Sequence, residues 1–171
     1  MRSATSTCAA VVAGAGVLLA GASVAIPSDR PLAYARVAIL GGALGALALH
    51  DVREHRIPNR IVLPAATICA ALSIAEGVQP SVGLYAGAVL VVVLLAVSLT
   101  VPAALGMGDV KLALLILCAL DGHTALALLT ALELYALVAV VLLIRRGRAA
   151  LGESLPLAPI VAASCLIAVL L

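Results

Sequence analysis

The stretch VGLYAGAVLVVVLLAVSLTVPAALGMGDVKLALLILCAL (82–120) holds two long apolar runs on either side of a short polar motif, GMGDVK (106–111). An apolar run of roughly 20 residues is long enough to cross the hydrocarbon core of a bilayer as a helix. The stretch therefore predicts a membrane helix, a polar break that contains Asp109 and Lys111, and a second apolar helix.

The composition of the whole chain agrees with a membrane protein. Of its 171 residues, 65% are hydrophobic and only 11% are charged, and the mean hydropathy is +1.29. A soluble domain of this length would carry many more charges on its helix faces. Basic residues interleaved with aromatic residues are missing, so the sequence does not favour nucleic acid as a partner. The expected surroundings are a lipid bilayer.

Apolar segments recur along the chain, and short polar clusters separate them. They lie near residues 8–26, 34–50, 60–76, 82–104, 109–120, 123–144 and 155–171. The pattern predicts an all-α, polytopic membrane bundle of about seven transmembrane helices. We divide it into an N-terminal helix within residues 1–30 and a membrane domain over residues 31–171. The first segment also resembles a signal peptide, with Arg2 before it and small residues at 23–25, but we expect it to be retained.

The positions of the basic residues predict the orientation of these helices. When the loop DVREHRIPNR (51–60) faces the cytoplasm, alternating spans place most Lys and Arg residues on that side. These are Arg2, Arg53, Arg56, Arg60, Lys111, Arg145, Arg146 and Arg148, whereas Arg30 and Arg36 fall outside. Because cytoplasmic loops carry an excess of basic residues, we expect the N-terminus to be cytoplasmic and the C-terminus to lie outside.

Two aspartates, Asp51 and Asp109, are placed at matching depth on the cytoplasmic side by this topology. Asp109 has a plain interpretation as a helix cap, because aspartate accepts hydrogen bonds from the free N–H groups of a first turn. Two carboxylates on neighbouring helices can also approach closely and share one proton. One can then act as a base on water while the other polarises a carbonyl, as in soluble aspartic proteases. The remaining aspartates, Asp29 and Asp121, are expected in outside loops, where they solvate or cap.

The residues around the aspartates have both structural and functional interpretations. Gly106 and Gly108 allow the backbone to unwind and a substrate strand to approach, or they simply form a turn. Pro58 and Asn59 are expected to start the third helix, with Asn59 as its cap, and substrate contact is the alternative. Lys111 either acts on Asp109 or the substrate, or extends its amine toward the interface.

Metal and cofactor sites have no support in the sequence. The four cysteines, Cys8, Cys69, Cys118 and Cys165, are widely separated inside apolar segments. Without a CxxC pair, a zinc site is not expected, and the cysteines are interpreted as small buried hydrophobic residues. We therefore expect neither a metal ion nor a cofactor.

The sequences ALHDVREHRIPNRIVL (48–63) and GMGDVKLALLILCAL (106–120) resemble the paired motifs of the type IV prepilin peptidases. These are bacterial membrane-embedded aspartic proteases of the GxGD class. The second motif, G-x-G-D-x-K, is matched in full. Near the C-terminus, LPLAPIVAASCL (155–166) is similar to the closing P-x-x-P element of the family, although the usual phenylalanines are missing. The resemblance extends over residues 37–171.

The resemblance implies a six-helix peptidase core in the bacterial inner membrane, with Asp51 and Asp109 as the catalytic pair. It also implies the substrates, which are pilin-like precursors of type IV pilus and secretion systems. Their leader peptide would be removed at the cytoplasmic face. The long family members also have a cytoplasmic domain with cysteine pairs, and they methylate the new N-terminus. This chain resembles the short members of Flp/Tad pilus systems, so no methyltransferase domain is expected.

Three other interpretations remain open from the sequence alone. A small transporter could use Asp51, Asp109 and Glu133 as a proton path, although the chain shows no inverted repeat. A structural subunit of a pilus or secretion assembly is a second alternative. Relatives of presenilin also carry G-x-G-D, but they pair it with a Tyr-Asp motif, whereas Asp51 follows His50. The oligomeric state is not predicted.

Overall fold

The computed structural model of the chain describes residue 17 and residues 30–54, 57–101, 105–146 and 157–170. These residues form only helices and their connections. The elements are α2 (Pro31–Glu54), α3 (Asn59–Glu76), α4 (Val82–Thr100), α5 (Met107–Leu120), a short 3-10 helix η1 (Asp121–His123), α6 (Thr124–Arg146) and α7 (Leu157–Leu170). The all-α prediction is confirmed for these ranges. The helix expected at 8–26 and the domain division at residue 30 remain predictions, because nearly all of residues 1–30 lie outside the described ranges.

Local sequence signals explain where several helices begin and end. Pro58 precedes α3 in an extended conformation, and Gly77 ends it with a φ of 66°, a left-handed conformation that glycine adopts without a Cβ penalty. At the start of α4, the Ser81 hydroxyl accepts a hydrogen bond from the backbone N–H of Leu84 at 3.1 Å. Such a cap satisfies one of the donors that a first helical turn leaves free.

The helix α2 is longer at both ends than its apolar segment, which was expected at 34–50. It continues to Glu54, so Asp51 lies inside its last turn rather than after the helix. Similarly, α5 begins at Met107, before Asp109 rather than at it. Both aspartates therefore have a helical backbone, and their side chains have fixed directions.

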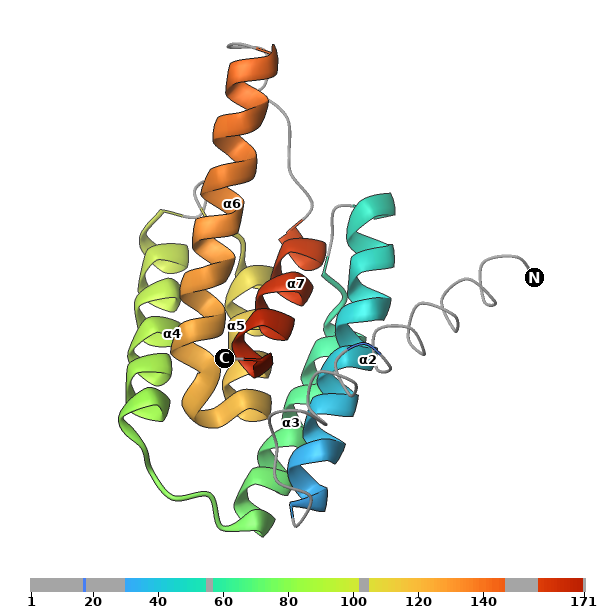
Figure 1. The fold of residues 1–171 in the computed structure, drawn as a ribbon, viewed down its shortest axis with the longest axis vertical. Coiled ribbons are helices and arrows are strands. Elements are labelled where there is room, and N and C mark those ends of the chain that lie inside the picture. The colour runs from blue at the N-terminus through green and yellow to red at the C-terminus, as the bar shows by residue number, and fades with distance from the viewer. Residues whose placement is uncertain (1–16, 18–29, 55–56, 102–104, 147–156, 171) are drawn as a thin grey trace, which may run out of the picture.

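Four helical stretches are long and apolar enough to cross a membrane, namely Pro31–Asp51, Asn59–Glu76, Val82–Thr100 and Met107–Arg145. The last combines α5, η1 and α6, which fold back on each other at η1 (Figure 1). Ala158–Leu170 is a shorter apolar helix. Large apolar side chains on α4 are exposed, including Val92 at 63% and Leu99 at 65%. A surface of this kind fits lipid rather than water, and the chain is a membrane-embedded protein.

The buried core lies between α2, α3, α5 and α7, and α4 and α6 pack on one side of it (Figure 1). Its fully buried side chains are mostly leucines together with two cysteines. They include Leu40, Leu44, Leu47, Leu112, Leu115, Ile116, Cys69 and Cys165. The interpretation as buried hydrophobic residues is confirmed for Cys69 and Cys165, whereas Cys118 is only partly buried. Cys8 lies outside the described residues.

Two glycines allow α4 to pack closely against η1 and the first residue of α6. A Cβ at Gly83 would lie 2.0 Å from the carbonyl oxygen of Gly122, and one at Gly87 would lie 2.7 Å from the Cβ of Thr124. Both distances are far below van der Waals contact, so a side chain at either position would push α4 away from η1 and the start of α6. The spacing of four residues places the two glycines on one face of α4.

An ion cluster lies where α2, α3 and η1 meet, at the end of the bundle opposite the GxGD motif. Arg36 is only 4% exposed and donates hydrogen bonds to the carboxylates of Asp121 and Glu76, the latter at 2.6 Å. The Ser73 hydroxyl donates to the other Asp121 oxygen at 2.8 Å. The expectation that Asp121 only solvates or caps a loop is therefore wrong, because its carboxylate pairs with a buried arginine.

This cluster also stabilises the reversal between α5 and α6. Asp121 has a φ of 44° and a ψ of −109°, a backbone conformation that residues other than glycine rarely adopt. Such a conformation costs on the order of 1–3 kcal/mol and persists only where surrounding contacts fix it. The bonds from Arg36 and Ser73 provide those contacts.

Candidate active site

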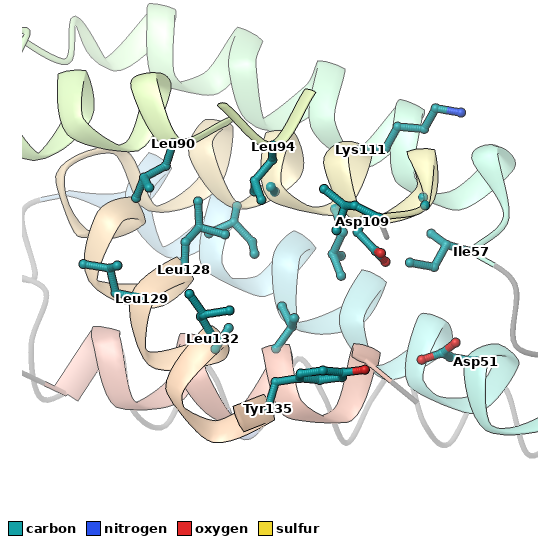
Figure 2. Close-up of a pocket in the computed structure, with 18 of the residues that line it drawn as sticks. Asp51, Ile57, Leu90, Leu94, Asp109, Lys111, Leu128, Leu129, Leu132 and Tyr135 are labelled. Atoms are coloured by element: carbon teal, nitrogen blue, oxygen red, sulfur yellow. The ribbon is translucent and has the colours of Figure 1, made fainter. Parts of the chain in front are cut away.

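A cavity of about 730 Å³ lies between α2, α4, α5 and α6, and both Asp51 and Asp109 line it (Figure 2). The two aspartates lie 58 residues apart in the sequence. Most of the other lining side chains are apolar. They include Ile57, Leu90, Leu94, Leu105, Leu112, Ile116, Leu128, Leu129, Leu132 and Val161. The sequence-based expectation that these two carboxylates share one end of the bundle agrees with this arrangement.

Asp51 is buried, with 7% of its surface exposed. Its Oδ2 atom accepts a hydrogen bond of 2.9 Å from the backbone N–H of Ala158, in the first turn of α7. The first N–H groups of a helix have no partner within the helix, so the carboxylate satisfies one of them. This bond joins the end of α2 to the start of α7 and holds one carboxylate oxygen in place.

Asp109 is the third residue of α5. Its backbone N–H donates a hydrogen bond of 3.1 Å to the carbonyl oxygen of Gly106, the residue at the N-cap position. The capping interpretation of its side chain remains a prediction, although the carboxylate lies beside Gly106. It does not exclude a chemical role, since the side chain also faces the cavity (Figure 2).

The two motif glycines have different surroundings. A Cβ at Gly108 would lie 3.2 Å from the Cβ of Ile57 and 3.4 Å from its Cδ1, so Gly108 allows the segment before α3 to pack against α5. A Cβ at Gly106 would meet nothing closer than 3.6 Å, an oxygen of the Asp109 carboxylate. The sequence left substrate approach and a simple turn open for both glycines, and it did not predict the packing of Gly108 against Ile57.

Lys111 and Asn59 form a contact at the mouth of the cavity. The Lys111 Nζ donates a hydrogen bond of 2.8 Å to the Asn59 Oδ1. Pro58, not Asn59, occupies the N-cap position of α3, and no side chain caps that helix. The expected start of the third helix is therefore confirmed, whereas the cap assigned to Asn59 is wrong. Its side chain joins the first motif to the second instead.

Other residues that the sequence suggested lie away from this cavity. Glu133 is exposed on α6, and no hydrogen bond in the described part of the chain joins it to Tyr135. His123 lies at the opposite end of the bundle. Pro156 falls outside the described ranges, and Pro159 lies in the first helical turn of α7.

Within the described ranges, no three His, Cys, Asp or Glu residues lie together as a metal site would require.

The model of the type IV leader peptidase family matches residues 38–171, which is most of the chain. The chain belongs to the type IV leader peptidase family. No curated protein and no solved structure matches it significantly. The match starts within α2 and includes every described residue of the cavity. As a leader peptidase of the prepilin type, the protein is a membrane-embedded protease, and its family implies pilin-like substrates.

Sequence reasoning missed three features of this leader peptidase site. Tyr135 lines the cavity from α6, Ile57 packs on Gly108, and Ala158 donates to Asp51. Tyr135 carried a weak signal, because it is one of only three tyrosines and lies within an apolar segment. The backbone contact of Ala158 has no signal in the sequence, since any non-proline residue can donate it.

Proposed function

We propose that this protein is an intramembrane aspartic endopeptidase that removes the leader peptide of pilin-like precursors at the cytoplasmic face of the membrane. Asp51 and Asp109 are the catalytic residues in this proposal. The observation that supports it most strongly is that these two carboxylates, from helices distant in sequence, line a single mostly apolar cavity. Membership of the leader peptidase family supplies the reaction class and the substrate class.

The chemistry requires two carboxyl groups with one proton between them. The ionised one removes a proton from a water molecule, and the protonated one donates a hydrogen bond to the carbonyl oxygen of the scissile peptide. The Asp51 carboxylate is anchored by the backbone N–H of Ala158, and Asp109 is held on the first turn of α5. Such anchoring fixes the directions of the side chains before substrate binds, and prepositioned groups lower the cost of reaching the transition state.

The apolar lining suits a substrate that arrives from the bilayer. Leu129 is 47% exposed and Leu132 is 66% exposed, and both also line the cavity. They connect the interior of the site with the lipid-facing surface of α6. A membrane-anchored precursor can therefore reach the aspartates by lateral movement while its apolar segment stays in lipid.

The charge at this end of the bundle supports a cytoplasmic location of the site. Arg60 and Lys111 lie in the first turns of α3 and α5, and Arg145 lies in the last turn of α6. These turns share the end of the bundle with the last turn of α2, which contains Asp51. The excess of basic residues on cytoplasmic sides supports the orientation that the proposal requires. Lys111 and Asn59, with Pro58 before them, position the two motifs and do not take part in proton transfer.

The test uses the purified protein in liposomes together with a pilin-like precursor, and mass spectrometry of the products. Wild-type protein should release the leader peptide at one bond, whereas Asp109→Asn should release none above background. Asn keeps the size of the side chain and an oxygen that can accept hydrogen bonds, so the fold is retained. Equal product from both proteins would refute the proposal.

A further inference from the structure

Tyr135 projects into the cavity from α6, on the wall opposite the Asp109 side chain (Figure 2). The other residues that α6 contributes to the lining are apolar, namely Leu128, Leu129, Ala131 and Leu132. In Figure 2 the Tyr135 hydroxyl is directed toward the side on which Asp51 lies. Among the described residues that α6 contributes to the lining, Tyr135 is therefore the only one whose side chain can form hydrogen bonds.

The hydroxyl of Tyr135 has no hydrogen-bond partner among the residues that the structure describes, although the side chain is half-buried. The Tyr135 oxygen is not one of the described buried polar atoms that lack a partner, so it is accessible from the cavity. A phenol that is accessible in an apolar cavity and makes no bond to the described protein can hydrogen-bond a ligand that enters the cavity. It can donate one hydrogen bond and also accept.

An extended peptide supplies such a partner. Cleavage requires a peptide bond whose backbone groups are free of helical hydrogen bonds, and each N–H and C=O group then needs a partner in a cavity that holds little water. We propose that Tyr135 is a substrate-positioning residue whose hydroxyl hydrogen-bonds the substrate backbone beside the scissile bond. The inference rests on the proposed function, because it assumes a peptide substrate between α5 and α6.

The experiment measures initial rates of precursor cleavage in liposomes for Tyr135→Phe, Tyr135→Leu and the control Tyr85→Phe. Tyr85 lies on α4, is 63% exposed and does not line the cavity. Loss of one neutral hydrogen bond should lower kcat/KM of Tyr135→Phe by about 3- to 10-fold. Tyr85→Phe should equal the wild type. The rate–pH profile of Tyr135→Phe should keep its shape, because the phenol takes no part in proton transfer.

Two results would overturn the inference. If Tyr135→Phe equals the wild type while Tyr135→Leu is impaired, the ring fills space and its hydroxyl does nothing. If Tyr135→Phe changes the shape of the pH profile, the phenol takes part in the proton chemistry instead of positioning the substrate.

A binding measurement separates this inference from the proposed function. In an Asp109→Asn background, which should bind without cleaving, Tyr135→Phe should weaken precursor binding by a similar 3- to 10-fold. Absence of cleavage by the wild type would refute the proposed function, whereas unchanged binding by the Tyr135→Phe variant would refute the role of the hydroxyl.

Discussion

At the scale of single residues, the two aspartates are held in different ways. The Asp51 carboxylate accepts a hydrogen bond from the backbone N–H of Ala158, at the start of α7, whereas Asp109 lies in the first turn of α5, and both line the cavity. A carboxylate can accept several hydrogen bonds, and the one bond from Ala158 leaves capacity for water and substrate. For Asp51, a structural and a catalytic role are therefore compatible.

The pH dependence of cleavage follows from a pair of acids that shares one proton. Initial rates measured at low substrate concentration should give a bell-shaped profile against pH. Activity falls at low pH because both carboxyl groups are protonated and no base remains. It falls at high pH because the shared proton is lost and the two like charges repel.

A control with a metal chelator belongs to the same measurement. The rate should be unchanged by the chelator, since a carboxylate activates the water in this mechanism. Loss of activity with the chelator, restored by added zinc, would contradict it.

At the scale of elements, the Arg36 cluster joins α2, α3 and η1 at the far end of the bundle. Arg36 is 4% exposed, and the carboxylates of Glu76 and Asp121 are each 15% exposed. Removing one partner of a buried ion pair leaves an uncompensated charge and typically costs about 3–5 kcal/mol. The cluster is therefore expected to stabilise the fold without touching the cavity that Asp51 and Asp109 line.

Substitution of Arg36 tests this role. Arg36→Met should lower the midpoint of thermal unfolding in detergent, by an amount that corresponds to about 3–5 kcal/mol. The variant with Glu76→Gln and Asp121→Asn added should recover most of that loss, because no buried charge is then left unpaired. If the three changes together destabilise the protein more than Arg36→Met alone, the ion pairs do not explain the effect.

The elements also show what the sequence could predict. The third helix was expected at 60–76 and is found at Asn59–Glu76, because Pro58 and Gly77 mark its ends. The ends of α2 were missed, since the helix continues through polar residues after its apolar segment. The pairing of Arg36 with Asp121 joins positions 85 residues apart, and no local pattern contains that information.

At the scale of the whole molecule, the fold separates two polar sites at opposite ends of an apolar bundle. Asp51, Asp109 and Lys111 line the cavity at one end, and the Arg36 cluster lies at the other. The sequence predicted that the two acids share a side because each apolar segment reverses the direction of the chain. It could not predict the cavity, which depends on how α4 and α6 pack beside the core.

The orientation in the membrane is tested by labelling single cysteines in a background without the native cysteines. A cysteine at position 56 or 146 should react with an impermeant reagent only from the cytoplasmic side. A cysteine at Gln79, in the exposed connection between α3 and α4, should react only from outside. Labelling of position 56 from outside would reverse the orientation.

The central claim, that Asp51 and Asp109 act as one unit, is tested most directly by the initial rates of two single variants and their combination. Asp51→Asn and Asp109→Asn should each lower the cleavage rate by at least about 10²–10⁴-fold. The double variant should be no slower than either one, because removing members of a unit is not additive. Circular dichroism and thermal unfolding confirm that each variant is folded. Near-normal cleavage by a folded Asp51→Asn variant, or losses that multiply in the double variant, would contradict a shared catalytic pair.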